Sequence, residues 1–236
     1  MSADRKAVVI TGASRGIGAA LVEAYRARGY RVVAISRSIK PSRDADILAV
    51  QGDIAERDTA ARAISEGLAR FGRIDSLINN AGIFISKPFT QYTQEDYAAI
   101  LSVNVAGFFH ISQLAVAAME KSGSGHIVQI TTSIDENSDA RVPAVLAALT
   151  KGGLNAATKS LAIEYAKRGI RVNAVAPAAT KTEMHPPETH KRLGESLPLG
   201  RMAEIADIVD AILYLESAGF VTGEILHVDG GQSAGH

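Results

Sequence analysis

The feature that most constrains the fold of this chain is a glycine-rich turn between an apolar run and a helical pattern. Residues 7–10 are continuously apolar, and Thr11-Gly12-Ala13-Ser14-Arg15-Gly16-Ile17-Gly18 follows at once and opens a helical segment, residues 17–28. Glycines let a backbone turn tightly and approach a pyrophosphate, and the N–H groups at the start of the helix attract its charge. The sequence therefore predicts a strand–turn–helix unit that holds a dinucleotide.

Short apolar runs alternate with longer helical patterns along the rest of the chain. This alternation predicts a parallel sheet, because parallel strands buried on both faces are continuously apolar. We expect one doubly wound, Rossmann-type α/β domain covering residues 1–236, with helices on both faces of the sheet. The predicted strands are residues 7–10, 31–35, 47–51, 76–79, 126–131, 171–175 and 224–228. The predicted helices are residues 17–28, 60–71, 93–119 (as one or two helices), 145–168 and 205–215.

Composition limits the class of partner. The chain has 236 residues, of which 47% are hydrophobic, enough for one well-buried domain. Its 25 basic and 25 acidic residues cancel, so nothing favours nucleic acid or an anionic membrane, and we expect a small-molecule partner. The absence of cysteine excludes disulfides and cysteine-ligated zinc, and we expect no metal site. With no signal-peptide pattern and no apolar run of membrane-spanning length, a soluble, cytoplasmic protein is expected.

Further motifs follow the glycine turn in order along the chain. They are Asp53 after the third strand, Asn79-Asn80-Ala81-Gly82, Asn104 in a helix, the strand at residues 127–132, Lys151, Asn173-Ala174-Val175-Ala176-Pro177 and Val228-Asp229-Gly230-Gly231. With the turn, they cover nearly the whole chain, which on these motifs resembles the short-chain dehydrogenase/reductase family. The resemblance implies a nicotinamide cofactor, hydride transfer, and a homodimer or homotetramer packed through the long helices.

The resemblance also implies roles for individual residues. Asp53 would bond the adenine, Asn79 to Gly82 would line the cofactor and support the sheet, Lys151 would hold the nicotinamide ribose, and Asn104 would bend its helix and hold a water toward Lys151. For Asp229, a turn-forming role beside its glycines stays open. The expected cofactor-binding residues are Gly12, Ser14, Arg15, Gly16, Ile17, Gly18, Ser36, Arg37, Asp53, Ile54, Asn80, Ala81, Gly82, Lys151, Pro177, Ala178, Thr180 and Thr182.

Charge at the end of the second strand favours NADP(H) over NAD(H). An acidic residue there would bond the adenosine ribose hydroxyls and repel a 2′-phosphate, whereas an arginine would attract that phosphate. Ser36 stands at the expected acidic place, Arg37 follows it, and Arg15 lies in the glycine turn on the same side. The predicted cofactor is therefore NADP(H).

The chain departs from the family at the position of its proton donor. The family signature is a tyrosine four residues before the active-site lysine, but Ala147 stands four residues before Lys151, and none of the six tyrosines has a lysine four residues later. A hydroxyl that bonds the substrate oxygen is expected at Thr132, with Ser133 as the one-residue alternative. Loss of a positioned acid typically lowers the rate by about 10²- to 10⁴-fold.

Three consequences of Ala147 stay open. The substrate could be an iminium that needs little acid help, stabilised by acidic residues after the catalytic strand. Another group could supply the proton, or the protein could bind its cofactor as a sensor or silent subunit without turnover. The acidic candidates are Asp135, Glu136 and Asp139, and the other candidate donors are Lys151, a water held by Asn104, and His185.

The function that we expect is an NADP(H)-dependent reduction of a small C=O or C=N bond. The predicted catalytic positions are Asn104, Thr132, Ser133, Ala147 and Lys151. The proline-rich irregular stretch around residues 183–198 is predicted to be a binding loop, and residues 183–199 to act as a lid over the pocket. Because alanine is smaller than tyrosine, we also expect extra room beside the nicotinamide.

Overall fold

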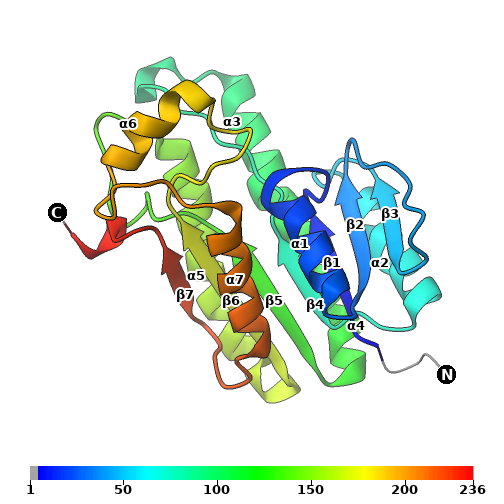
Figure 1. Ribbon diagram of the computed structural model, residues 1–236. Coiled ribbons are helices and arrows are strands. Elements are labelled where there is room, and N and C mark those ends of the chain that lie inside the picture. Colours follow the sequence, from blue (N-terminus) through cyan, green and yellow to red (C-terminus); the bar gives the residue numbers. More distant parts are fainter. Residues whose placement is uncertain (1–4, 236) are drawn as a thin grey trace.

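The computed structural model describes residues 5–235, and its centre is a parallel sheet of seven strands (Figure 1). The strands are β1 (Ala7–Thr11), β2 (Arg31–Ser36), β3 (Ile47–Gln51), β4 (Ser76–Asn79), β5 (Gly125–Ile130), β6 (Ile170–Pro177) and β7 (Ile225–Val228). Their order across the sheet is β3-β2-β1-β4-β5-β6-β7, and all paired strands are parallel. From β1 to β3 the chain adds strands on one side of β1, and from β4 onward it adds them on the other side. The strand order therefore switches between β1 and β4, and ligands bind outside the carboxyl ends of the strands at such a switch point.

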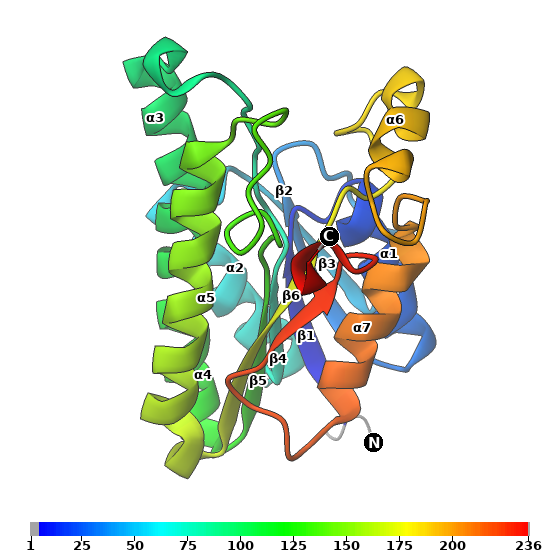
Figure 2. The ribbon, with the colours of Figure 1, turned by 90° about the vertical axis from the view of Figure 1, so that its left-hand side faces the viewer.

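Helices cover both faces of the sheet, which confirms the predicted fold class (Figure 2). Helices α1 (Gly16–Ala27) and α7 (Ile205–Ser217) pack together on one face, where Leu21 and Ile212 join strand residues such as Ile10 in one apolar core. Helices α2 (Arg57–Phe71), α4 (Gly107–Ser122) and α5 (Val145–Tyr165) cover the other face, with Ile111 and Ala162 in a second core. The two cores make the molecule a three-layer sandwich.

The segment predicted as one or two helices over residues 93–119 is continuous but not uniform. It consists of α3 (Gln94–Ile100), a π-helical stretch η2 (Leu101–Ala106) and α4, and it begins at a capping box formed by Thr93 and Asp96. Its 29 residues, 94–122, are long and apolar enough to cross a membrane by length and composition alone, which corrects the expectation that the chain has no run of this kind. Core helices of soluble proteins meet the same criterion, and Ile111, Ala115 and Met119 of this helix are fully buried within the fold.

Several predicted boundaries are corrected. Helix α2 begins three residues earlier than predicted, β6 extends at both ends, and the α-helical part of the predicted helix 145–168 stops at Tyr165 and ends in the 3₁₀ turn η3 (Ala166–Arg168). The stretch 183–198 is not wholly irregular, because it contains the turn η4 (Pro187–Thr189) and the short helix α6 (His190–Glu195). Two further single turns, η1 (Phe89–Gln91) and η5 (Gln232–Ala234), were also not predicted, since such short elements show no hydrophobic period.

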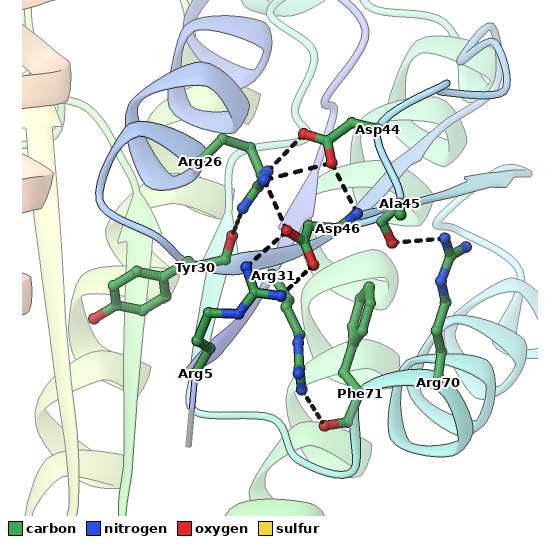
Figure 3. Close-up of polar contacts among 9 residues, drawn as sticks. All are labelled: Arg5, Arg26, Tyr30, Arg31, Asp44, Ala45, Asp46, Arg70 and Phe71. Atoms are coloured by element: carbon green, nitrogen blue, oxygen red, sulfur yellow. Dashed lines mark hydrogen bonds and ion pairs between the residues drawn. The ribbon is translucent and has the colours of Figure 1, made fainter. Parts of the chain in front are cut away.

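Side-chain ion pairs hold the helix-free connection between β2 and β3 (Figure 3). Arg26 of α1 contacts the carboxylates of Asp44 and Asp46 at 2.9 Å each, and Arg5 contacts Asp46 at 2.7 Å. Arg70 of α2 donates a hydrogen bond of 2.7 Å to the carbonyl oxygen of Ala45. These contacts tie the end of the connection to both helix layers. At its other end, at the carboxyl edge of β2, Ser36 donates a hydrogen bond to Ser14 of the glycine turn.

Candidate functional site

A cavity of about 700 Å³ lies at the carboxyl ends of the strands. Nineteen of the predicted site residues line it, and they come from all parts of the chain. They are Gly12, Ser14, Arg15, Gly16, Ile17, Ser36, Arg37, Asp53, Ile54, Asn80, Ala81, Gly82, Thr132, Ala147, Lys151, Pro177, Ala178, Thr180 and Thr182. Three other predicted site residues, Gly18, Asn104 and Ser133, do not line this cavity.

The glycine turn is held in a conformation that only glycine adopts easily. Gly12 and Gly16 have φ angles of 67° and 55°. Gly18 has no room for a side chain, because a Cβ there would lie 2.2 Å from the carbonyl oxygen of Gly12. Asn80 closes the turn by donating to the carbonyl oxygens of Thr11, at 2.9 Å, and Gly12, at 3.2 Å.

This turn places the start of α1 against the cavity. Arg15 is the N-cap and forms no side-chain capping bond, so the first N–H groups of the helix stay available to a ligand. A close backbone approach combined with a helix N-terminus is the arrangement that binds a pyrophosphate. The residues present therefore fit a dinucleotide.

Hydroxyl groups and arginines gather at one end of the cavity. Ser36 donates to the hydroxyl oxygen of Ser14 at 2.8 Å, and Ser38 donates to the same oxygen at 3.2 Å. Arg37 is 71% exposed, and its Nη1 atom lies 3.9 Å from Oδ2 of Asp53. With Arg15 also on the cavity wall, this end presents positive charge and hydrogen-bond donors, the groups that hold a phosphate.

The other end of the cavity lies where β5 ends and α5 begins. Thr132 lines it, and its hydroxyl oxygen accepts a hydrogen bond from the N–H group of Ile134 at 3.3 Å. Ser133 is fully buried and donates at 3.1 Å to Oε1 of Gln232. Of the two hydroxyls considered from the sequence, the one that meets the cavity is that of Thr132.

Lys151 extends from α5 toward the same wall. Its Nζ atom donates a hydrogen bond to the carbonyl oxygen of Ile130, the last residue of β5. Gly82 makes this position possible, since a Cβ there would lie 3.1 Å from Nζ. Burial lowers the pKa of the Lys151 amine to about 8.

Ala147 lies one helical turn before Lys151, also on the cavity wall. None of the residues that line the cavity in the described chain is a tyrosine. The hydroxyls of Tyr25 and Tyr30 bond Glu216, and that of Tyr92 donates to the carbonyl oxygen of Ile85. No tyrosine hydroxyl replaces the one that Ala147 lacks.

Asn104 lies in the π-helical stretch, where it connects three segments. Its Oδ1 atom accepts from the N–H group of Ile83 at 2.9 Å, and its Nδ2 atom donates to the carbonyl oxygen of Ile83 at 3.1 Å and to the hydroxyl of Thr150 at 3.3 Å. Asn104 and Lys151 share a second, small cavity of about 10 Å³. This volume is near the lower limit for one water molecule.

The acidic residues considered from the sequence differ in their surroundings. Asp135 accepts a hydrogen bond from Asn155 at 2.7 Å, and Glu136 lies 3.3 Å from the imidazole of His227. Neither lines the large cavity, whereas Asp139 does. Asp139 is paired with Arg141 at 2.8 Å, so its charge is already compensated.

Two other residues proposed from the family resemblance have structural partners. Asn79 donates to the hydroxyl of Ser112 at 2.9 Å and does not line the large cavity. Asp229 accepts from the N–H groups of Gly231, at 3.0 Å, and Ser233, at 2.8 Å, so it forms a turn.

The predicted site residues make up half of the cavity wall, and sequence reasoning missed several others. Ser38 also faces Ser14, and its place two residues beyond Ser36 was a signal that could have found it. Other missed residues are remote from the motifs or belong to segments without a clear pattern, so no local signal marked them. Among them are Ile83, Phe84 and Gln232, whereas Met184, Leu193 and Leu197 of the wall belong to the predicted lid.

Comparisons with known proteins agree with this architecture. Residues 12–233 match the family described as Enoyl-(Acyl carrier protein) reductase. The chain is 34% identical to the 3alpha-hydroxysteroid dehydrogenase of Mediterraneibacter gnavus and 34% identical to the 3-oxoacyl-[acyl-carrier-protein] reductase FabG of Salmonella typhimurium, with 98% of each chain covered in both comparisons. The solved structure "ElxO with NADP Bound" has a TM-score of 0.91 at 28% identity and covers 98% of this chain and 100% of its own.

The fold and the cavity define an oxidoreductase of the Rossmann type. The chain belongs to the short-chain dehydrogenase/reductase family.

Proposed function

We propose that this chain is an NADP(H)-dependent oxidoreductase that reduces a C=O or C=N bond of a small molecule without a tyrosine acid. The observation that carries the proposal is the cavity itself. It runs from the glycine turn and the serine–arginine cluster to Thr132, Ala147 and Lys151. One end therefore suits a phosphorylated dinucleotide, and the other presents a hydroxyl and an amine to a substrate.

Different residues on the cavity wall would bind different parts of the cofactor. The glycine turn and the start of α1 would hold the pyrophosphate, and Ser14, Ser36 and the two arginines would hold the 2′-phosphate. Asp53 and Ile54 would meet the adenine, and Lys151 the nicotinamide ribose. Bound NADPH supplies the hydride. The NADP carried by the structural neighbour ElxO supports this assignment.

The substrate end would then stabilise the charge that develops on oxygen. Thr132 donates a hydrogen bond to that oxygen, and the positive charge of Lys151 lowers the energy of the transition state. Residues 182–185, with Leu193 and Leu197 of the predicted lid, lie on the cavity wall. They would exclude water from the bound substrate. Ala147 leaves room beside the nicotinamide for a bulkier substrate.

The second candidate function is cofactor binding without turnover, as a sensor or silent subunit. Ala147 favours it, because an alanine transfers no proton. The glycine turn, the serine–arginine cluster and Lys151 serve binding equally well in an enzyme and in a sensor. Turnover separates the two candidates.

We further propose a cytoplasmic protein of one domain, residues 1–236, that forms a homodimer or homotetramer through its long helices. Exposed apolar side chains on those helices support this assembly. They are Val105 (36% exposed), Val145 (43%), Phe109 (52%), Leu149 (61%) and Ile163 (80%). Light scattering at micromolar concentration would show a dimer or tetramer, and a monomer would contradict the proposal.

The test of the proposed function follows NADPH absorbance against matched ketones and preformed cyclic imines. The native protein is expected to oxidise NADPH with at least one of these substrates, and Ala147→Tyr to gain ketone reduction. Native protein that binds NADPH and consumes none, while Ala147→Tyr reduces ketones, would favour the sensor.

A further inference from the structure

We infer that Lys151 itself delivers the proton to the substrate oxygen, in the place of the tyrosine hydroxyl that the chain lacks. This inference rests on the proposed function and goes beyond it, because that function requires only that Lys151 hold the ribose and provide charge.

The geometry brings the amine to the reacting end of the cavity. Ala147 precedes Lys151 by one helical turn on the same face of α5, and both residues line the cavity. The hydrogen bond from Nζ to the carbonyl oxygen of Ile130 anchors the amine two residues before Thr132. The proton on Nζ and the hydroxyl of Thr132 therefore belong to one wall of the cavity.

The carboxyl groups near the site are poorly placed to donate a proton. Asp135 and Glu136 are not among the residues that line the cavity. Asp139 lines it, but Arg141 donates to both of its carboxylate oxygens, at 2.9 Å and 2.8 Å. A carboxylate whose two oxygens both accept from a guanidinium is poorly placed to give a proton to a substrate.

His185 lines the cavity from the lid and is the remaining candidate. Burial and the neighbouring His190 lower the pKa of His185 below its usual value of 6.5. Both effects favour the neutral form of its imidazole. Lys151, with its pKa lowered to about 8 by burial, still carries a proton at pH 7 and gives it up more readily than a solvent-exposed lysine.

The charges that face this amine are few. The charged or titratable residues that share the cavity are Arg15, Arg37 and Asp53 at the dinucleotide end, Asp139 after β5, and Glu183 and His185 on the lid. Burial is the cause of the lowered pKa of Lys151. The fall in the rate of ketone reduction at alkaline pH is therefore expected to report the loss of the proton from Lys151.

The proposed step balances in protons and electrons. The hydride and its electron pair form the new C–H bond, and the π pair of the carbonyl moves to oxygen. That oxygen takes a proton as the N–H bond of Lys151 breaks, which leaves a neutral amine that regains a proton from water. NADPH is oxidised to NADP⁺, and the ketone is reduced to an alcohol. A permanently charged N-methyl cyclic iminium needs the hydride alone and no proton.

The first experiment compares these two substrates in the holoenzyme. Lys151→Arg keeps the positive charge but does not release a proton near neutral pH. We expect this variant to lose ketone reduction by about 10²- to 10⁴-fold and iminium reduction by only a few fold. Lys159→Arg, an exposed position on the same helix, is the matched control and should change neither activity. An equal loss of both activities in Lys151→Arg would overturn the inference and leave only the ribose-holding role.

The pH profile of ketone reduction tests whether Lys151 is the proton donor, without any use of the iminium substrate. The native kcat should fall as the pH rises through about 8, and His185→Ala should keep this limb. Disappearance of the limb in His185→Ala would assign the proton to the lid and overturn the inference.

A third readout needs no turnover. Acetylation of Lys151 by acetic anhydride, followed by peptide mass spectrometry, should reach half its maximal rate near pH 8. A midpoint for Lys151 near the ordinary lysine value of about 10.4 would contradict the inference. Native protein that binds NADPH but reduces neither substrate would instead contradict the proposed function.

Discussion

The Nδ1 atom of His126 lies 3.0 Å from Oε2 of Glu216, and the two side chains are only 3% and 6% exposed. They lie at the amino-terminal edge of the sheet, opposite the cavity. The Nε2 atom of His126 is 3.2 Å from Nδ2 of Asn173, whose Oδ1 accepts from the N–H group of Glu224. Since Nδ2 can only donate, Nε2 of His126 accepts, and its Nδ1 carries the hydrogen that bonds Glu216.

This pair predicts a loss of stability in acid. Burial lowers the pKa of His126 below 6.5. Burial raises the pKa of Glu216, but hydrogen bonds from His126, Ser76 and Tyr25 outweigh it and lower the pKa to about 2. Below pH 6.5 the unfolded chain binds more protons at His126 than the folded one, and below pH 4.5 it also binds more at Glu216. The free energy of unfolding should therefore fall from pH 7 to 5 and fall further as the pH drops through 4.5. Urea unfolding across this range measures the slope, and a stability that rises in acid would contradict the prediction.

Gly18→Ala is expected to damage the glycine turn. Because the added Cβ would lie 2.2 Å from the carbonyl oxygen of Gly12, the backbone must move, at a cost of about 1–3 kcal/mol of folding stability. NADPH binding, followed by fluorescence, should weaken with it. Gly153→Ala is the control, since the Cβ it would add in α5 has no atom within 4 Å apart from its own chain neighbours and helix backbone, and it should leave binding unchanged and stability equal or higher. Similar behaviour of the two variants would show that the close contact is unimportant.

Arg37→Ala should weaken NADPH binding selectively. Loss of a charge-assisted hydrogen bond to the 2′-phosphate costs about 1.5–3 kcal/mol, or about 10- to 100-fold in Kd. NADH lacks that phosphate, so its Kd should not change. Arg43→Ala removes an exposed arginine from the same connection and should affect neither cofactor. Equal weakening of NADPH and NADH in Arg37→Ala would place Arg37 elsewhere than at the phosphate.

Gln232→Ala should affect substrate more than cofactor. Gln232 lines the cavity, and its side-chain Oε1 accepts a hydrogen bond from Ser133. Its backbone carbonyl oxygen accepts a hydrogen bond from the side chain of Asn137. Removal of its side chain leaves the buried Ser133 hydroxyl without this partner and loosens the substrate wall. Steady-state kinetics should show a raised KM for the carbonyl substrate and an unchanged Kd for NADPH. A change in NADPH binding alone would rule out this role.

Most of the fold could be predicted because its signals are local. The apolar run at residues 7–10, the glycine turn and the later strand–helix alternation each depend on neighbouring residues, and together they specify a doubly wound sheet. The nineteen predicted residues on the cavity wall followed from motifs that parallel strands bring to one edge. The short helix α6 escaped prediction because one and a half turns carry no readable period.

The sequence by itself determined the fold class, the glycine turn, the family motifs and the absence of a tyrosine at position 147. Only the tertiary structure decided which hydroxyl meets the cavity, because the chain turns after β5 and directs Thr132 to the cavity and Ser133 toward Gln232. It also decided that Arg141 compensates Asp139 and that burial makes Lys151 more acidic. Pairing and burial depend on residues far apart in the chain, and no local pattern records those distances.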